Sequence, residues 1–243
     1  MIINDFQDFV DILRGKKFNL FDFIRFKTFK YNLISLGQNC FPRVICTFAK
    51  LKPTKAYGEL SCPFDLAYYY NIDNLIKILE NDFETYFDET NFDNEAQTFI
   101  NYPLNINFVH DGKLSKEQFI NRYKKRIENF EYYLNNEKPL ICLFYAESEI
   151  HREQILRIYE FIKNKRNGKF FRLIVAHHSD IDTKNMPKNL ILVDNIDVFK
   201  LEKEGPWIRM LRPNTRKKNK LANEIYTNVT NAIKQAIKES CNN

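Results

Sequence analysis

The stretch that decides the fold is YNLISLGQNCFPR, which spans residues 31–43. Its first half is an apolar run that ends at Gly37, and an amphipathic segment continues over residues 41–51. This pattern predicts a buried strand, a tight turn and the start of a helix. Cys40 falls at the predicted helix N-terminus, where free backbone N–H groups and the helix dipole stabilise a thiolate. The stretch therefore predicts a reactive thiol, but it indicates no particular substrate.

The length and composition predict one sizeable domain. The 243 residues are 44% hydrophobic, which is enough to bury a single large core. We expect residues 1–30 to form a helical extension rich in basic and aromatic side chains, and residues 31–243 to form a single α/β domain. The net charge is +6, but 37 basic and 31 acidic residues are mostly interspersed. We therefore expect only a weak preference for anionic partners and no nucleic-acid binding.

Five cysteines without a CxxC pair argue against a zinc knuckle or a disulfide framework and favour a reducing compartment. The N-terminus lacks the basic flank and long apolar core of a signal peptide, and no apolar run approaches the roughly 18 residues that span a bilayer. We therefore expect a cytoplasmic protein. Four of the cysteines are expected to be small buried hydrophobic residues: Cys46, Cys62, Cys142 and Cys241.

The basic and aromatic segment at residues 16–30 has two interpretations. Its bulky apolar side chains and interspersed lysines suit a segment that lies on an anionic membrane surface. They also suit a helix that packs on the core with its lysines in water, which is the interpretation we favour. Residues 5–14, which precede it, have a helical apolar period.

Apolar periodicity predicts the remaining elements. Residues 82–99 show no clear period, so we expect an irregular insertion that forms part of a cleft wall or lid. The block Pro63-Phe64-Asp65 is expected on a loop beside the first turn, because proline disfavours a central strand. Further strands are predicted at 104–109, 140–146, 170–176 and 190–193, further helices at 73–79, 116–134, 148–164 and 221–237, and a loop at 206–213.

This alternation predicts a three-layer α/β fold with a mostly parallel central sheet and helices on both faces. In such folds, ligands bind outside the carboxyl ends of the strands. Three predicted strands are followed by polar turns that contain Cys40, His110 and His177. These three residues are therefore candidates for one edge of the sheet, where a site would form.

Several short motifs carry a family resemblance. SLGQNC at residues 35–40, the Pro63-Phe64-Asp65 block and FVHD at residues 108–111 occur in this order. Together with the apolar strands near 140–146 and 171–177, the pattern resembles a bacterial family of domains of unknown function described as putative papain-like cysteine peptidases. The resemblance covers about residues 31–210. It implies Cys40 as the nucleophile and His110 as its base, and a papain-like α+β fold is the alternative to the parallel α/β fold.

The residues around this pair suit acyl chemistry. Gln38 and Asn39, with the N–H of Cys40 in the turn that begins at Gly37, are natural donors to an oxyanion. Asp65 is our candidate for orienting His110, because the side chain of the adjacent Asp111 would point the other way along a strand. Asp111 and His177 remain further cleft candidates.

We therefore expect a cysteine-dependent hydrolase or acyl transferase that acts on an acyl, amide or glycan-linked small molecule or peptide. No metal or cofactor is indicated, and the sequence leaves the oligomeric state open. The alternative is a non-catalytic or glycosyltransferase-like protein of bacterial surface polysaccharide assembly. We expect four basic residues to form the solvated face of one helix, whereas in this alternative they would line a cleft for an anionic ligand: Arg122, Lys124, Lys125 and Arg126.

Overall fold

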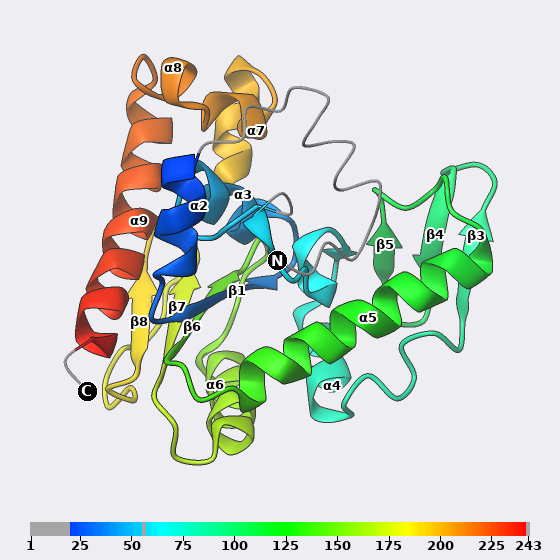
Figure 1. The fold of residues 1–243 in the computed structure, drawn as a ribbon. Coiled ribbons are helices and arrows are strands. Elements are labelled where there is room, and N and C mark those ends of the chain that lie inside the picture. The colour runs from blue at the N-terminus through cyan, green and yellow to red at the C-terminus, as the bar shows by residue number, and fades with distance from the viewer. Residues whose placement is uncertain (1–19, 55–56, 242–243) are drawn as a thin grey trace.

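The structure, a computed structural model, describes residues 20–54 and 57–241. Its described part contains a parallel and an antiparallel four-stranded sheet (Figure 1). The parallel sheet has the strand order β1-β6-β7-β8, which confirms the predicted parallel α/β core. Its strands are β1 (Asn32–Gly37), β6 (Leu140–Tyr145), β7 (Phe171–Ala176) and β8 (Leu190–Val193).

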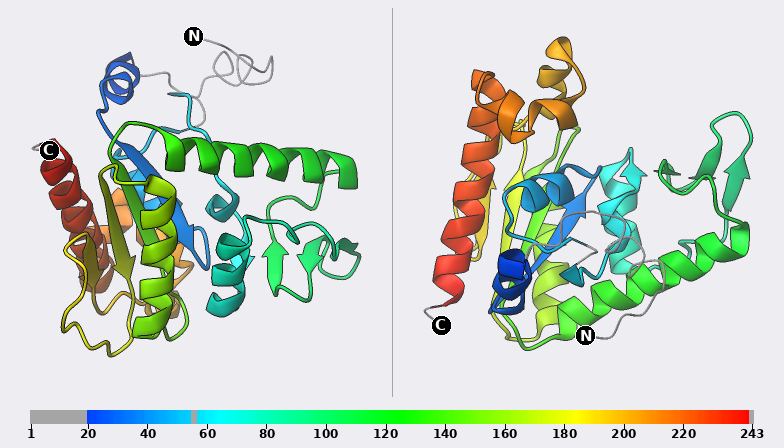
Figure 2. Two further views of the ribbon diagram at one scale, coloured as in Figure 1. Left: turned by 90° about the horizontal axis from the view of Figure 1, so that it is seen from below. Right: turned by 45° about the horizontal axis from the view of Figure 1, so that its top comes forward.

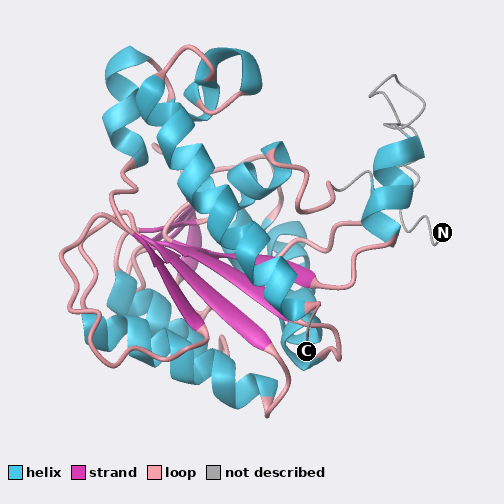
Figure 3. Ribbon diagram, turned by 90° about the vertical axis from the view of Figure 1, so that its left-hand side faces the viewer, coloured by secondary structure: helices cyan, strands magenta, loops and turns pink. Residues whose placement is uncertain are grey.

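The parallel sheet buries apolar side chains on both faces. On one face, Leu36 of β1 joins a core formed with α5 (Lys116–Asn135) and α6 (Arg152–Arg166). On the other face, Leu33 joins a core formed with α3 (Phe41–Phe48) and α9 (Lys220–Ser240). Figure 3 shows the C-terminal helix α9 running across the strands. Burial on both faces explains why these strands are continuous apolar runs in the sequence.

The antiparallel sheet lies on the other side of the molecule and was not predicted. The strand expected at 104–109 exists only as β5 (Ile106–Phe108), and it belongs to this sheet. Residues 82–99, expected to be irregular, contain β3 (Thr90–Asp93) and the start of β4 (Thr98–Asn101). The fourth strand, β2, is Tyr68–Tyr69.

The shortness of these strands explains why the antiparallel sheet was not predicted. Strands of two to four residues leave no measurable period in the sequence, and their pairing is fixed by contacts with distant residues. The rings of Phe99 and Phe119 stack at 4.2 Å between β4 and α5. Figure 2 shows α5 reaching from the parallel sheet to the antiparallel strands β3 and β4.

The remaining boundaries confirm some predictions and correct others. The helix predicted at 116–134 forms as α5, which begins with a capping box between Ser115 and Gln118, whereas α6 begins at Arg152, four residues later than expected. The chain predicted as a loop after residue 206 forms two short helices. The remaining elements are α2 (Leu20–Lys27), the 3₁₀ helix η2 (Pro63–Asp65), α4 (Ile72–Glu80), the 3₁₀ helix η3 (Val198–Glu204), α7 (Trp207–Met210) and α8 (Pro213–Arg216).

Helix α2 covers part of the basic and aromatic segment. Phe26 packs against the rings of Phe29 and Tyr57, whereas Phe21 and Ile24 are exposed. The predicted helix at 5–14 and residues 16–19 lie outside the described residues. None of the helices in the described ranges is long and apolar enough to cross a membrane.

Arg166, at the end of α6, is fully buried, and no carboxylate among the described residues forms an ion pair with it. Its guanidinium donates to the carbonyl oxygens of Leu134 at 2.9 Å, Asn136 at 2.6 Å, Lys138 at 3.0 Å and Phe170 at 3.1 Å. Burial lowers the pKa of this guanidinium. The side chain thereby donates to backbone carbonyls at the end of α5 and before β6 and β7, and it ties these three segments together.

Candidate functional site

The candidate site begins at Gly37, the last residue of β1. Its φ is +129°, and a Cβ atom at this position would lie 2.4 Å from the carbonyl oxygen of Tyr145. Only glycine allows the two backbones to approach this closely. The N–H of Gln38 then donates to the same carbonyl at 3.1 Å. The turn is thus fixed at the point where β1 leaves β6.

This turn lies at a topological switch point. After β1 the chain enters α3, whose Phe41 and Ile45 belong to the core shared with α9. After the neighbouring strand β6 it enters α6, whose Ile155 belongs to the opposite core. Ligands of open α/β sheets bind where adjacent parallel strands send their helices to opposite faces. Cys40 lies at this switch point.

Gln38 joins three segments at the switch point. Its Oε1 accepts hydrogen bonds from the N–H groups of Glu147 at 2.8 Å and Ser148 at 2.9 Å, and its Nε2 donates to the carbonyl of Tyr69 at 3.1 Å. The N–H of Tyr69 donates to the carbonyl oxygen of Gln38 at 2.7 Å. Gln38 is 2% exposed. Its side-chain amide is therefore engaged in structural bonds, and donating to an oxyanion would require breaking one of them.

Asn39 is also held by hydrogen bonds, and one of its partners is Glu147, a residue that the sequence analysis did not single out. Its Nδ2 donates to Oε2 of Glu147 at 2.7 Å, and its Oδ1 accepts from the N–H of Phe41 at 2.8 Å. The other oxygen of Glu147 accepts a hydrogen bond from the hydroxyl of Tyr68. Glu147 is the first acidic residue after the apolar run at 140–146, so its position after β6 was a usable signal.

Cys40 is the N-cap residue of α3 and is partly exposed. Burial raises the pKa of its thiol, as do Asp65 and Glu147, against the lowering effects of its own backbone N–H and of Arg43. This direction is opposite to the expected thiolate stabilisation. Burial is the largest cause of this difference, and the helix start does little to oppose it, because Pro42 has no N–H and the N–H of Phe41 is bonded to Asn39.

The other cysteines differ from Cys40. Cys46, Cys62 and Cys142 are buried as predicted, and burial raises the pKa of each thiol. Cys241 was also predicted to be buried, but it is exposed at the end of α9. It follows the last turn of the helix, beyond the apolar face that packs on the sheet.

His110 lies in the turn after β5, at the end of an antiparallel strand rather than at the carboxyl edge of the parallel sheet. It is exposed, and no hydrogen bond joins it to Cys40 in the described structure. Partial burial of the ring lowers its pKa; Arg126 and Arg43 also lower it, whereas Asp111 opposes them. Arg43 acts on the pKa of both Cys40 and His110, so the two residues share this charged neighbour.

Asp111 anchors the end of β5 to α5. It is 1% exposed, and its carboxylate lies 2.5 Å from Arg122 Nη1 and 3.4 Å from Arg126 Nη1, and accepts from the hydroxyl of Tyr123 at 2.9 Å. The prediction that Arg126 belongs to a solvated face is therefore wrong, since this residue is 6% exposed. Its guanidinium instead lies over the Tyr123 ring, 4.4 Å from the centroid.

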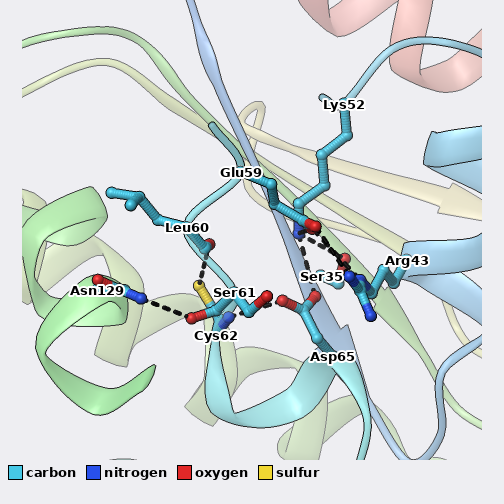
Figure 4. A network of polar contacts seen from close by, with 9 residues as sticks. All are labelled: Ser35, Arg43, Lys52, Glu59, Leu60, Ser61, Cys62, Asp65 and Asn129. Atoms are coloured by element: carbon cyan, nitrogen blue, oxygen red, sulfur yellow. Dashed lines mark hydrogen bonds and ion pairs between the residues drawn. The ribbon is translucent and has the colours of Figure 1, made fainter. Parts of the chain in front are cut away.

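Asp65 belongs to a buried network of paired charges (Figure 4). One oxygen lies 3.0 Å from Nζ of Lys52, and the other accepts from the N–H of Cys62 at 2.6 Å. Lys52 Nζ also lies 3.2 Å from Glu59, which pairs with Arg43 at 2.8 Å. Burial would lower the pKa of Lys52, but Asp65 and Glu59 outweigh it and raise the pKa. Both oxygens of Asp65 thus have partners other than His110.

His177 ends β7 at the same edge as the Cys40 turn. It is 0% exposed, burial lowers its pKa, and its Nε2 lies 3.0 Å from Oδ1 of Asp194. Side chains alternate along a strand, so His177 faces the same side as Val175, which packs with α6, whereas Cys40 begins α3 on the other side. The described residues contain no group of three or more His, Cys, Asp or Glu side chains that could hold a metal ion.

Comparison with known proteins supplies one match. Neither the curated proteins nor the solved structures contain a match to this chain. A family model described as "Putative papain-like cysteine peptidase (DUF1796)" matches residues 31–181, which include Cys40, His110 and His177. The matched range is more than half of the 243 residues. The chain therefore belongs to the family described as putative papain-like cysteine peptidases.

Proposed function

We propose that the protein is a cysteine-dependent hydrolase of acyl or amide bonds, with Cys40 as the nucleophile and His110 as the general base. The observation that carries the proposal is the position of Cys40, a partly exposed thiol at the switch point between β1 and β6. Cys46, Cys62 and Cys142 are buried in the cores. The family description supports a cysteine hydrolase at the level of the reaction class.

The pKa directions favour a neutral thiol and a neutral imidazole before the reaction. Burial raises the pKa of Cys40, and partial burial lowers that of His110. The imidazole would therefore take the thiol proton as Sγ bonds to the acyl carbon, and it would return this proton to the leaving group when the carbon–nitrogen or carbon–oxygen bond breaks. Water then releases the acyl group, or an amine or hydroxyl acceptor takes it in a transferase reaction.

The backbone N–H of Cys40 is our proposed oxyanion donor. This N–H belongs to the same residue as the attacking sulfur, and an oxyanion forms next to the attacking atom. The side chains of Gln38 and Asn39 would support this turn through their existing bonds. We assign no orienting role to Asp65, because Lys52 and Cys62 occupy its oxygens.

Hydrolysis of a panel of activated thioesters, esters and amides tests this proposal. Cys40→Ser should abolish turnover, and His110→Ala should lower kcat/KM by roughly 100-fold or more, the usual contribution of a general base. His178→Ala is the matched control, because it removes an exposed histidine at the end of another strand. Turnover that survives Cys40→Ser, or an equal loss in both histidine variants, would overturn the assignment. Adding an acceptor amine and measuring the acylated product separates transfer from hydrolysis.

A further inference from the structure

Glu147 connects the two sheets at the candidate site. Its N–H is bonded to Gln38, its Oε2 accepts from Asn39, and its Oε1 accepts from Tyr68 of the antiparallel sheet. Asn39 in turn accepts from the N–H of Phe41 at the start of α3. A single carboxylate therefore links the helix start that carries Cys40 to the sheet whose strand β5 precedes His110.

This carboxylate is half-buried and lacks a cation. No Lys, Arg or His lies within ion-pair distance of Glu147 in the described ranges. Its charged surroundings are instead acidic, because Asp197 and Glu202 from the segment after β8 act on it. Burial raises the pKa of Glu147, and the bonds from Tyr68 and Asn39 only partly oppose this effect. A half-buried carboxylate without a cation costs folding free energy, so its presence calls for an explanation.

We infer that Glu147 is a positioning residue that fixes the Cys40 turn against the antiparallel sheet and whose negative charge restrains the reactivity of the Cys40 thiol. The inference rests on the proposed function only in taking Cys40 as the reactive group. It adds a residue that acts on Cys40 through Asn39 and through the electrostatic field. Neutralising this charge makes the thiolate easier to form.

Charged groups around Cys40 and Glu147 determine how the reactivity of the thiol depends on pH. Cys40 is influenced by Arg43, Asp65 and Glu147, and Glu147 is influenced by Tyr68, Asp197 and Glu202. Arg43 and Asp65 are held in the buried network with Glu59 and Lys52. Substitution of Glu147 therefore removes one charge from the field at Cys40 and leaves that network intact.

Alkylation of Cys40 by iodoacetamide tests the inference without a substrate. The rate is measured between pH 6 and 9 by peptide mass spectrometry in a Cys241→Ser background, which removes the exposed thiol. Glu147→Gln should raise the rate at pH 7 roughly threefold or more and move the pH profile to lower pH, because a negative charge that raises the pKa of the Cys40 thiol is removed. The matched control, Glu149→Gln, removes the same charge from an exposed position two residues away. Equal rates in Glu147→Gln and Glu149→Gln would overturn the electrostatic role.

Glu147→Asp distinguishes the positioning role of Glu147 from the effect of its charge. It also tests the inference if Glu147→Gln does not fold. The shorter side chain keeps the charge but cannot reach both Asn39 and Tyr68. Alkylation should then keep the pH profile of the parent, while amide hydrogen exchange at Phe41 should become faster. Exchange at Phe41 as slow as in Glu149→Gln would overturn the positioning role. If Cys40→Ser retains turnover but these results hold, the proposed function fails and the inference about thiol reactivity stands.

Discussion

Two carboxylates flank the Cys40 turn in contrasting surroundings. Asp65 is fully buried with Lys52 beside it, in a network of two carboxylates and two cations. Glu147 is half-buried, is held by neutral donors, and has two further carboxylates nearby. Both carboxylates raise the pKa of Cys40.

The comparison distinguishes a carboxylate that stabilises the fold from a carboxylate whose charge acts on the candidate site. A buried carboxylate with a fixed cation contributes to one stable arrangement, and removing one partner leaves the other charge uncompensated. A carboxylate held by an amide and a hydroxyl keeps its geometry if its charge is lost. We therefore expect substitutions in the Asp65 network to change stability, and substitutions at Glu147 to change the reactivity of Cys40.

Lys52→Met should give the largest effect on stability. The substitution leaves Asp65 and Glu59 buried with only Arg43 as a cation, which should lower the free energy of unfolding by about 3 to 5 kcal/mol. Urea unfolding monitored by circular dichroism measures it. Lys50→Met is the matched control, because Lys50 pairs with Asp22 at 2.9 Å near the surface and should change stability by under about 1 kcal/mol. A similar loss of unfolding free energy in the two variants would show that the buried Lys52 network contributes no more to stability than the surface pair of Lys50 and Asp22.

Glu147→Gln should change stability at neutral pH by less than about 1 kcal/mol, since Gln can keep one acceptor and one polar contact. The pH dependence is more informative. The pKa of Glu147 in the folded protein lies above its ordinary value near 4.5. The folded state therefore binds the proton more tightly, and this contribution to stability is present at low pH and lost as the pH rises through the folded pKa. Unfolding measured at pH 4, below the ordinary pKa, and at pH 8 should show this loss in the parent and not in Glu147→Gln. The same loss in both proteins would show that another group causes it.

His177 should make the smallest contribution to the pH dependence of stability, under about 1 kcal/mol in the free energy of unfolding. Burial lowers its pKa below the ordinary 6.5, so the unfolded chain binds its proton more tightly. Stability should then fall as the pH drops from about 6.5 towards the folded pKa. His177→Gln should flatten this slope in unfolding experiments between pH 5 and 7. His110→Gln serves as the comparison, because the pKa of this exposed histidine is also lowered. An unchanged slope in His177→Gln would assign the pH dependence to other groups.

The sequence predicted the parallel sheet because its strands are buried on both faces and appear as apolar runs. The turn at Gly37 was also predictable, since the apolar run ends there and the amphipathic pattern of α3 follows. The antiparallel sheet was not predictable, because β2 has two residues and β5 has three. His110 was therefore assigned to the wrong sheet, although its position after a strand was correct.

The surroundings of the candidate site depend on pairs of residues that are not neighbours in the sequence. Asp65 pairs with Lys52, a residue that precedes Pro53 and looks like an ordinary loop lysine. Glu147 meets Asn39 and Tyr68, which are 108 and 79 residues away in the chain. No local pattern encodes such pairs, so the sequence predicted the thiol and its turn but not the groups that control the thiol.

The position of Arg166 has a consequence for the order of folding. Its acceptors at Leu134, Asn136 and Lys138 lie 28 to 32 residues away, and Phe170 lies four residues away. These separations are short compared with those that join Glu147 to the Cys40 turn and to Tyr68. Contacts with small sequence separation close first, because they lose less chain entropy. We therefore expect the segment from α5 to β7 to assemble early, and the junction at Cys40 to form as one of the last steps.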